Sequence, residues 1–175
     1  MKKSFFIVAV TMLTFISCKN ATTTDTGTTS NPQDKNLENN NMVYKAIETG
    51  DMKPVDSLFA NDVVDHQGPG GKDISGKNNV MTMLGDIHNH VKDLKLDVIT
   101  SAANGDYIFS LVHVTGTPSD SSMGMPGTKI DEREVDVVKL KDGKAAEHWG
   151  FADDAEVSKR MMEMQSKMSE MGKKK

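Results

Sequence analysis

The order of hydrophobic patterns along the chain predicts an α+β fold, with N-terminal helices packed on a strongly curved antiparallel sheet. Two helical patterns come first, around residues 37–49 and 80–91, where apolar residues recur every three or four positions. Strand patterns separated by turns then dominate residues 94–153. Such a sheet covered by helices would form a cone with an internal pocket, a usual place for a ligand.

The first helix is expected to end near Gly50, and a short helical turn follows Pro54, a residue favoured at a helix N-terminus. The apolar residues that define the two helical faces are Leu37, Met42, Val43, Ala46 and Ile47 in the first, and Val80, Met83, Leu84, Ile87 and Val91 in the second.

The strand signals are alternation of apolar with polar residues and glycine-containing turns between them. Asn104-Gly105 and Asp142-Gly143 are both typical of tight hairpin turns. The expected strands are, in chain order, a short one at 63–66 before the glycine-rich loop 67–71, one at 94–98, one at 107–117, one at 128–140 after the loop 118–127, and one at 144–153. The last four would form an antiparallel meander.

The N-terminus has the pattern of a lipoprotein signal peptide over residues 1–18. Lys2 and Lys3 precede an apolar run at 5–16 that is too short for a mature membrane span, and Ser17-Cys18 follows. We expect cleavage before Cys18 and acylation of its thiol, which would anchor an exported protein to a bacterial membrane. An ordinary secretory peptide that happens to contain a cysteine is the alternative.

Between this peptide and the domain, residues 19–36 are polar and predict a disordered tether. The domain itself is expected over 37–154, followed by a Met-rich helix with a basic end over 155–175. Cys18 is the only cysteine, so the mature domain has neither a disulfide nor a thiolate metal site. The net charge of −4 argues against a nucleic-acid partner.

The final strand carries an unusual density of reactive groups, with His148, Trp149 and Asp153 close together. In a regular strand, His148 and Trp149 face opposite ways, whereas Trp149 and Asp153 share a face. If Trp149 lines the pocket, His148 would point at the helices or at solvent. Asp153 is either a buried acid/base or the N-cap of the following helix, and Asp154 could share these two roles.

Four stretches give the chain a resemblance to the SnoaL-like polyketide cyclase family, within the nuclear-transport-factor-2-like cone fold. They are Asp65-His66 with its glycine-rich continuation, Val114-Thr115-Gly116-Thr117, Val135-Asp136-Val137-Val138, and Asp142-Gly143-Lys144 through Glu147-His148-Trp149-Gly150 to Asp153. The resemblance implies an intramolecular aldol closure in an apolar cavity, with Asp153 as the catalytic carboxylate. It also implies a homodimer. The chain departs from the family in having Leu111 and Pro118 where many members have arginine and histidine.

Four other residues are candidates for the pocket. His66 ends a strand beside a glycine-rich loop, and is either a pocket or a surface histidine. His113 lies on an apolar strand face, where a core role is the alternative to ligand contact. Asp136 faces either the cavity or a charged edge, and His148 is included although its parity opposes that of Trp149. We expect no cofactor and no metal site. His88 and His90, two positions apart, cannot share a helix face, the other histidines lie on separate elements, and the domain has no cysteine ligand.

These observations lead to three hypotheses about function. The first is a membrane-tethered domain that binds a small apolar or carbonyl-bearing molecule, with cyclase- or isomerase-type proton transfer by Asp153. The second is a non-catalytic module of the same fold that binds a ligand or a protein. The third is copper handling by the thioethers of the tail, although methionines at helical spacing more often form a packing stripe.

Overall fold

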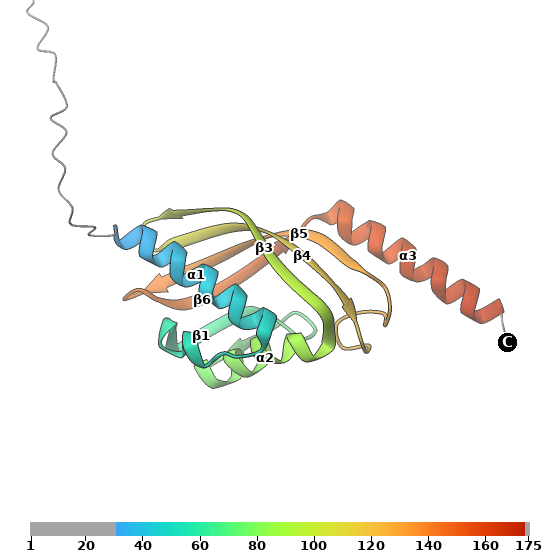
Figure 1. Ribbon diagram of the computed structural model, residues 1–175, viewed down its shortest axis with the longest axis horizontal. Helices are drawn as coiled ribbons and strands as arrows, with labels where there is room; N and C mark the ends of the chain where they lie inside the picture. The colour runs from blue at the N-terminus through green and yellow to red at the C-terminus, as the bar shows by residue number, and fades with distance from the viewer. Residues whose placement is uncertain (1–30, 174–175) are drawn as a thin grey trace, which may run out of the picture.

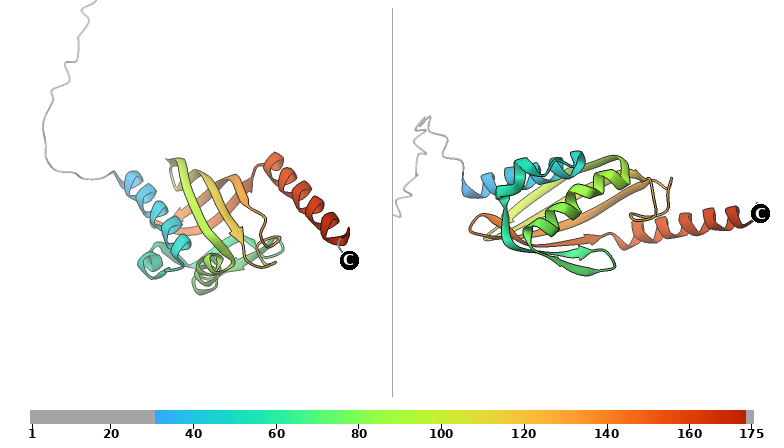
Figure 2. Two further views of the ribbon diagram at one scale, coloured as in Figure 1. Left: turned by 45° about the vertical axis from the view of Figure 1, so that its right-hand side comes forward. Right: turned by 90° about the horizontal axis from the view of Figure 1, so that it is seen from below.

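The computed structural model describes residues 31–173, which form three α-helices, a 3-10 helix and six strands. Helices α1 (Pro32–Thr49) and α2 (Lys77–His90) pack against one face of the sheet, and η1 (Lys53–Leu58) connects α1 to the first strand. Figures 1 and 2 show these helices in a layer over the curved strands. The predicted α+β class is therefore confirmed.

All six strands belong to one mixed sheet, with the order β2-β1-β6-β5-β4-β3. The strands are β1 (Phe59–Gly68), β2 (Lys72–Ser75), β3 (Val91–Asn104), β4 (Tyr107–Pro118), β5 (Ile130–Lys141) and β6 (Lys144–Ala152). Strands β3 to β6 form the predicted antiparallel meander. The sheet, predicted to be antiparallel, is mixed, because β1 pairs with β6 in parallel. This pairing brings residues far apart in the chain together.

The boundaries of α1 have local causes. The Asn31 side chain accepts a hydrogen bond from the backbone N–H of Gln33, and Pro32 occupies the first turn. Gly50 ends the helix with φ +75°, a left-handed conformation that glycine adopts at little cost. Residues 32–36 thus belong to α1 rather than to the predicted tether. Residues 19–30 lie outside the described part of the chain.

The expected hairpin turns are present. Asp142 and Gly143 both have positive φ, +53° and +73°, as the two central residues of a type I′ turn require. Gly105 also has positive φ in the turn between β3 and β4. At the other end of β3, the helical spacing had predicted that Val91 belongs to the preceding helix. In the structure, Val91 is the first residue of the strand.

The curvature of the sheet is associated with irregular pairing between β3 and β4. The register shifts twice along this pair, between Lys92 and Lys95 and between Val98 and Thr100. Such bulges bend a strand and increase its twist. Gly116 lies against the first shift, where a Cβ would overlap the Val91 side chain. Absence of a side chain at this position lets the two strands approach.

We call the sheet face covered by α1 and α2 the inner face, and the opposite one the outer face. The core lies between the helices and the inner face, and its members include Tyr44, Ile47, Val55, Val63, Val80, Leu94, Leu96 and Val112. On the outer face, several large apolar side chains are exposed, among them Phe109, Val135 and Phe151. Alternation along β4, β5 and β6 therefore separates two chemically different faces.

Helix α3 (Asp154–Lys173) confirms the predicted helical tail and projects beyond the sheet (Figure 1). Ion pairs fasten its first turns to β5, between Arg160 and Glu132 and between Glu156 and Arg133. Met161, Met162 and Met168 are exposed on it. No helix within residues 31–173 is long and apolar enough to cross a membrane. The predicted signal peptide and lipid attachment at Cys18 lie outside the described residues.

Candidate functional site

The inner face carries a group of buried and half-buried polar residues next to the apolar core. We call it the inner polar cluster, and its members are Tyr44, Asp65, Ser110, Glu134, Asp136 and His148. The helix α1 and four strands contribute to it, so only the folded chain assembles it. Burial of so many polar groups is costly unless they pair with one another.

His148 lies between two aspartates. Its Nδ1 donates a hydrogen bond to Asp65 Oδ2 at 2.9 Å, and its Nε2 lies 3.5 Å from Asp136 Oδ1. Asp65 is almost completely buried, and its second oxygen accepts the backbone N–H of Gln67 at 2.8 Å. The parallel register of β1 and β6 places Asp65 directly beside His148.

Asp136 connects the histidine to helix α1. The Tyr44 hydroxyl donates to Asp136 Oδ2 at 2.9 Å, whereas Asp136 Oδ1 is buried with no hydrogen-bond donor. A parallel chain of contacts runs one turn earlier on the helix, where Asn40 donates to Ser110, and Ser110 bonds to Ser101 at 2.9 Å. The helix is thus tied to three strands through polar side chains.

Sheet pairing explains why these residues share a face. Asp136 pairs with Ser110 on one side and with Gly150 on the other, and His148 pairs with Val138. Because side chains alternate along β5, Glu134 lies on the same face as Asp136. The cluster therefore forms a band across the inner face of β4, β5, β6 and β1.

The aspartates keep His148 protonated. Burial opposes its charge, but the carboxylates of Asp136 and Asp65 outweigh this effect and raise the pKa of His148 to about 10. Burial by itself would raise the pKa of Asp65. The hydrogen bond and the charge of His148 lower it by more, so the pKa of Asp65 is below its usual value. At neutral pH, this pair is an imidazolium held by a carboxylate.

Glu134 differs from its neighbours because it titrates near neutrality. Burial, followed by the charge of Asp136, raises its pKa to about 7. The same two causes raise the pKa of Tyr44 far above its usual value, so Tyr44 stays a neutral donor. A carboxyl group with a pKa near 7 can both accept and donate protons at physiological pH. The cluster thus contains one acid/base group beside one fixed cation.

Two hollows of the described structure lie elsewhere. One, of about 710 Å³, runs along α1 and η1 beside Leu37, Met42 and Pro54, and the other, of about 570 Å³, lies between Met52 and Gly85. Neither is lined by a member of the inner polar cluster. We place the candidate site at the cluster, since converging titratable groups are a better indication of chemistry than volume.

Gly150 lies at the solvent-facing side of the cluster. A Cβ at this position would collide with the side-chain amide of Gln67, which rests against the bare backbone. Gln67 is exposed, and so is Ala152, the next inner-face residue of β6. His148 and Glu134 are only partly exposed. A ligand that reaches His148 from this side would therefore meet the Gln67 amide first.

Comparison with known proteins identifies the fold. The profile described as SnoaL-like polyketide cyclase matches residues 39–160 of the chain, well over half of its length. The chain belongs to the SnoaL-like polyketide cyclase family. Among curated proteins, no sequence matches it.

Solved structures agree with this membership. A protein described as a SnoaL-like polyketide cyclase from Shewanella denitrificans has 15% identity and a TM-score of 0.61, covering 74% of this chain and 98% of its own. IdmH, described as a polyketide cyclase from Streptomyces antibioticus, has 20% identity and a TM-score of 0.59, covering 73% of this chain and 98% of its own. A protein described as a SnoaL-like polyketide cyclase from Agrobacterium tumefaciens has 12% identity and a TM-score of 0.60, covering 72% of this chain and 97% of its own. At these identities, the likeness establishes the fold and not the reaction.

Two of the residues predicted for the pocket of this SnoaL-like domain lie in the cluster, namely His148 and Asp136. The predicted parity of β6 is correct. His148 lies on the helix-covered face, one of the two alternatives expected for it, and Trp149 lies on the opposite face. Trp149 stacks on His66, with ring centroids 4.9 Å apart, and both belong to the outer face. His113 also lies there, 2.7 Å from Asp131.

Asp153 lies outside the cluster. It is exposed, and its side chain accepts the backbone N–H of Ala155 at 2.8 Å, as an N-cap of α3 does. Asp154 is exposed as well and forms the first residue of the helix. Neither residue has the desolvated surroundings that the prediction of a catalytic carboxylate requires. The capping role, which the sequence left open, is the one that the structure shows.

Sequence reasoning missed Tyr44, Glu134 and the role of Asp65. One signal was available for Glu134, because Glu132, Glu134 and Asp136 alternate along a strand whose other inner-face residues, Ile130 and Val138, are apolar. Carboxylates on an apolar strand face predict a buried acidic site. Asp65 and Tyr44 offered no comparable signal, since their partners are more than 80 positions away.

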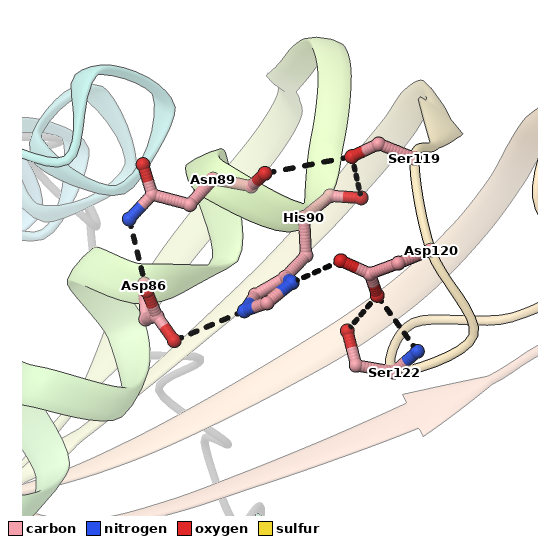
Figure 3. Close-up of polar contacts among 6 residues, drawn as sticks. All are labelled: Asp86, Asn89, His90, Ser119, Asp120 and Ser122. Carbon is pink, nitrogen blue, oxygen red and sulfur yellow. Dashed lines mark hydrogen bonds and ion pairs between the residues drawn. The ribbon is translucent and has the colours of Figure 1, made fainter.

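A second group of polar contacts joins α2 to the loop after β4 (Figure 3). His90 lies between Asp120, at 2.5 Å, and Asp86, at 3.1 Å, while Ser119 donates to the backbone carbonyl of His90. Ser122 donates to Asp120 through its backbone N–H and its hydroxyl. These contacts are largely exposed, and they fasten the loop to the helix end. Within residues 31–173, no group of three His, Cys, Asp or Glu residues is placed to hold a metal ion.

Proposed function

We propose that the inner polar cluster binds a small carbonyl-bearing molecule and transfers a proton at the carbon beside the carbonyl. Glu134 would accept the proton, the electron pair of the broken C–H bond would move onto the carbonyl oxygen, and Glu134 would later return the proton. Membership of the SnoaL-like polyketide cyclase family supports this class of reaction, although the fold alone does not require it.

The observation that carries the proposal is the combination of Glu134 and His148. The pKa of Glu134 is raised to about 7, which suits a general base at physiological pH. His148 remains a cation, and its Nε2–H faces Asp136 Oδ1 at 3.5 Å, longer than a well-formed hydrogen bond. A fixed N–H donor on a cation would stabilise an enolate oxygen. Asp65 would keep the imidazolium oriented.

The reaction of 5-nitrobenzisoxazole tests this proposal, because its ring opens when a base removes one proton and the coloured product reports the rate. After subtraction of the rate without protein, we expect a rate that rises with pH around a midpoint near 7, as the carboxylate of Glu134 forms. Glu134→Gln should reduce the rate at least about a hundredfold. Asp131→Asn, which changes a carboxylate on the outer face of the same strand, should leave it unchanged.

Two results would contradict the proposal. One is full activity in Glu134→Gln, and the other is a midpoint near 4.5, the ordinary value for glutamate. Asp153→Asn tests the sequence-based assignment in the same assay. Loss of activity there, with activity kept in Glu134→Gln, would return the catalytic role to Asp153.

Tethering through an acylated Cys18 remains a prediction, and metabolic labelling of the full chain with a fatty acid, compared with Cys18→Ser, would test it. Homodimerisation, implied by the family resemblance, also remains a prediction. So does copper binding by the tail, for which Met161, Met162 and Met168 offer exposed thioethers. Titration with Cu(I), with the three methionines replaced by leucine as the comparison, would decide it.

A further inference from the structure

We propose that the ligand of the inner polar cluster carries a protonated amine, so that the substrate class is a small carbonyl compound with a cationic nitrogen. This inference deepens the proposed function and rests on it for the place of binding. The balance of charges at the cluster and a buried carboxylate oxygen without a close donor support it.

The charged groups of the site do not balance. Four carboxyl groups belong to the inner face of the sheet, from Asp65, Glu132, Glu134 and Asp136. Among the described residues, His148 and Arg160 pair with them, and His66 acts on Asp65 alone. Arg160 pairs with Glu132 at 2.9 Å, and His148 pairs with Asp65. Glu134 and Asp136 therefore share one cationic neighbour, the His148 ring, whose Nε2 faces Asp136.

Asp136 has a buried carboxylate oxygen without a close donor. The residue is 5% exposed, yet its Oδ1 receives no hydrogen bond and lies 3.5 Å from the nearest cationic nitrogen, that of His148. A buried carboxylate oxygen without a donor costs free energy, and such exceptions in native proteins call for a partner. An ammonium N–H of a ligand would satisfy this oxygen and also supply the missing positive charge.

The titration of Glu134 links this binding to pH. The strands beside Glu134 pair it with Val112 and Ala152, which do not titrate, so the groups that affect it are Asp136, Glu132 and His148. Its raised pKa, about 7, reflects an environment in which a further negative charge is poorly stabilised. A bound cation would lower this pKa, and a bound carboxylate would raise it. Amine binding should therefore strengthen above pH 7 and release a proton.

Three probes of nearly the same shape separate charge from size. They are 2-(dimethylamino)ethanol, which is protonated at neutral pH, the uncharged 3-methylbutan-1-ol, and the anion 3-methylbutanoate. Their affinities for the full chain are measured by the shift of the His148 ring signals in NMR spectra at pH 6 and pH 8. We expect the amine to bind about tenfold more tightly than the alcohol at pH 8, and the anion to bind most weakly.

Glu134→Gln should reduce the preference for the amine at pH 8, and Asp131→Asn should not. Proton release on amine binding, measured by calorimetry of the unmodified chain in two buffers of different ionisation enthalpy, gives a readout that needs no variant. Equal binding of the three probes, tighter binding of the anion, or no binding of the amine would overturn the inference. Proton transfer without preference for the amine would refute this inference alone, whereas preference for the amine without proton transfer would refute only the proposed reaction.

Discussion

His148 and Asp65 are 83 positions apart in the chain, yet their side chains form a hydrogen bond of 2.9 Å between neighbouring parallel strands. Asp136 approaches the same ring from the antiparallel neighbour on the other side. The histidine is thus held in its charged form by strands on both sides of it. This relationship underlies the proposed chemistry and has direct consequences for stability.

The first prediction concerns the protonation of His148. NMR titration of the full chain should show its ring losing a proton near pH 10, because the carboxylates of Asp136 and Asp65 outweigh burial. A folded-state pKa above the unfolded value near 6.5 stabilises the fold fully below pH 6.5, and this stabilisation is lost as pH rises towards 10. His148→Gln should lower the free energy of unfolding by about 3–5 kcal/mol at pH 6. In this variant, the free energy of unfolding should not decline between pH 7 and 10. A midpoint near 6.5 would refute the pairing.

The second prediction concerns Tyr44. Tyr44→Phe removes the hydroxyl that donates to Asp136 Oδ2, so Asp136 would lose its only hydrogen bond from the helix. We expect a loss of about 1–3 kcal/mol in the free energy of unfolding, measured by denaturant titration. The other tyrosine of the chain, Tyr107, is exposed on the outer face, so Tyr107→Phe is a matched control with an expected change below about 0.5 kcal/mol. Equal losses in the two variants would contradict the assigned role.

The third prediction compares two glycines of the sheet. In Gly116→Ala, the new methyl group meets the buried Val91 side chain and lies 3.3 Å from the Lys92 carbonyl oxygen, which the strand cannot easily move. We expect a cost of about 2–3 kcal/mol in thermal or denaturant unfolding. In Gly150→Ala, the nearest atoms to the methyl group belong to the exposed Gln67 amide, which can rotate away, so the cost should stay below about 1 kcal/mol. A larger loss of stability in Gly150→Ala than in Gly116→Ala would show that the Gln67 side chain is held firmly.

The fourth prediction concerns the start of α3. Asp153→Ala removes the acceptor for the Ala155 N–H and should destabilise the first turn by about 1 kcal/mol, seen as faster amide exchange in α3. Asp154→Ala, one position further on, removes a charge but no capping hydrogen bond, and should have a smaller effect. If both variants exchange at the same rate, the capping role is wrong.

The fifth prediction concerns the loop fastened by His90. Asp120 raises the pKa of His90 more than Asp86 does, so the contact should persist to higher pH than for an isolated histidine and weaken as pH rises through that raised value. Asp120→Asn should speed amide exchange in residues 119–127. Asp86→Asn removes a contact on the helix itself and should affect the loop less. Unchanged exchange in Asp120→Asn would show that the Ser119 contacts alone hold the loop.

Much of the fold followed from local patterns. The helices α1 and α2, the two glycine turns and the meander from β3 to β6 depend on residues close in sequence, whose periodicity and turn chemistry are visible without the structure. The α+β class, the family resemblance and the alternation that separates His148 from Trp149 were predictable for the same reason. Lipid attachment at Cys18 stays a prediction of the sequence.

Which side of the final strand meets the helices was not a local property. Trp149 and His148 alternate in any strand, and only the docking of α1 shows that the histidine faces inward, beside Asp136 and Tyr44. The parallel pairing of β1 with β6, which delivers Asp65, likewise depends on contacts between distant segments. Sequence periodicity gives the spacing of side chains along a strand, but the partner that covers each face, and with it the pKa of every buried group, depends on tertiary packing.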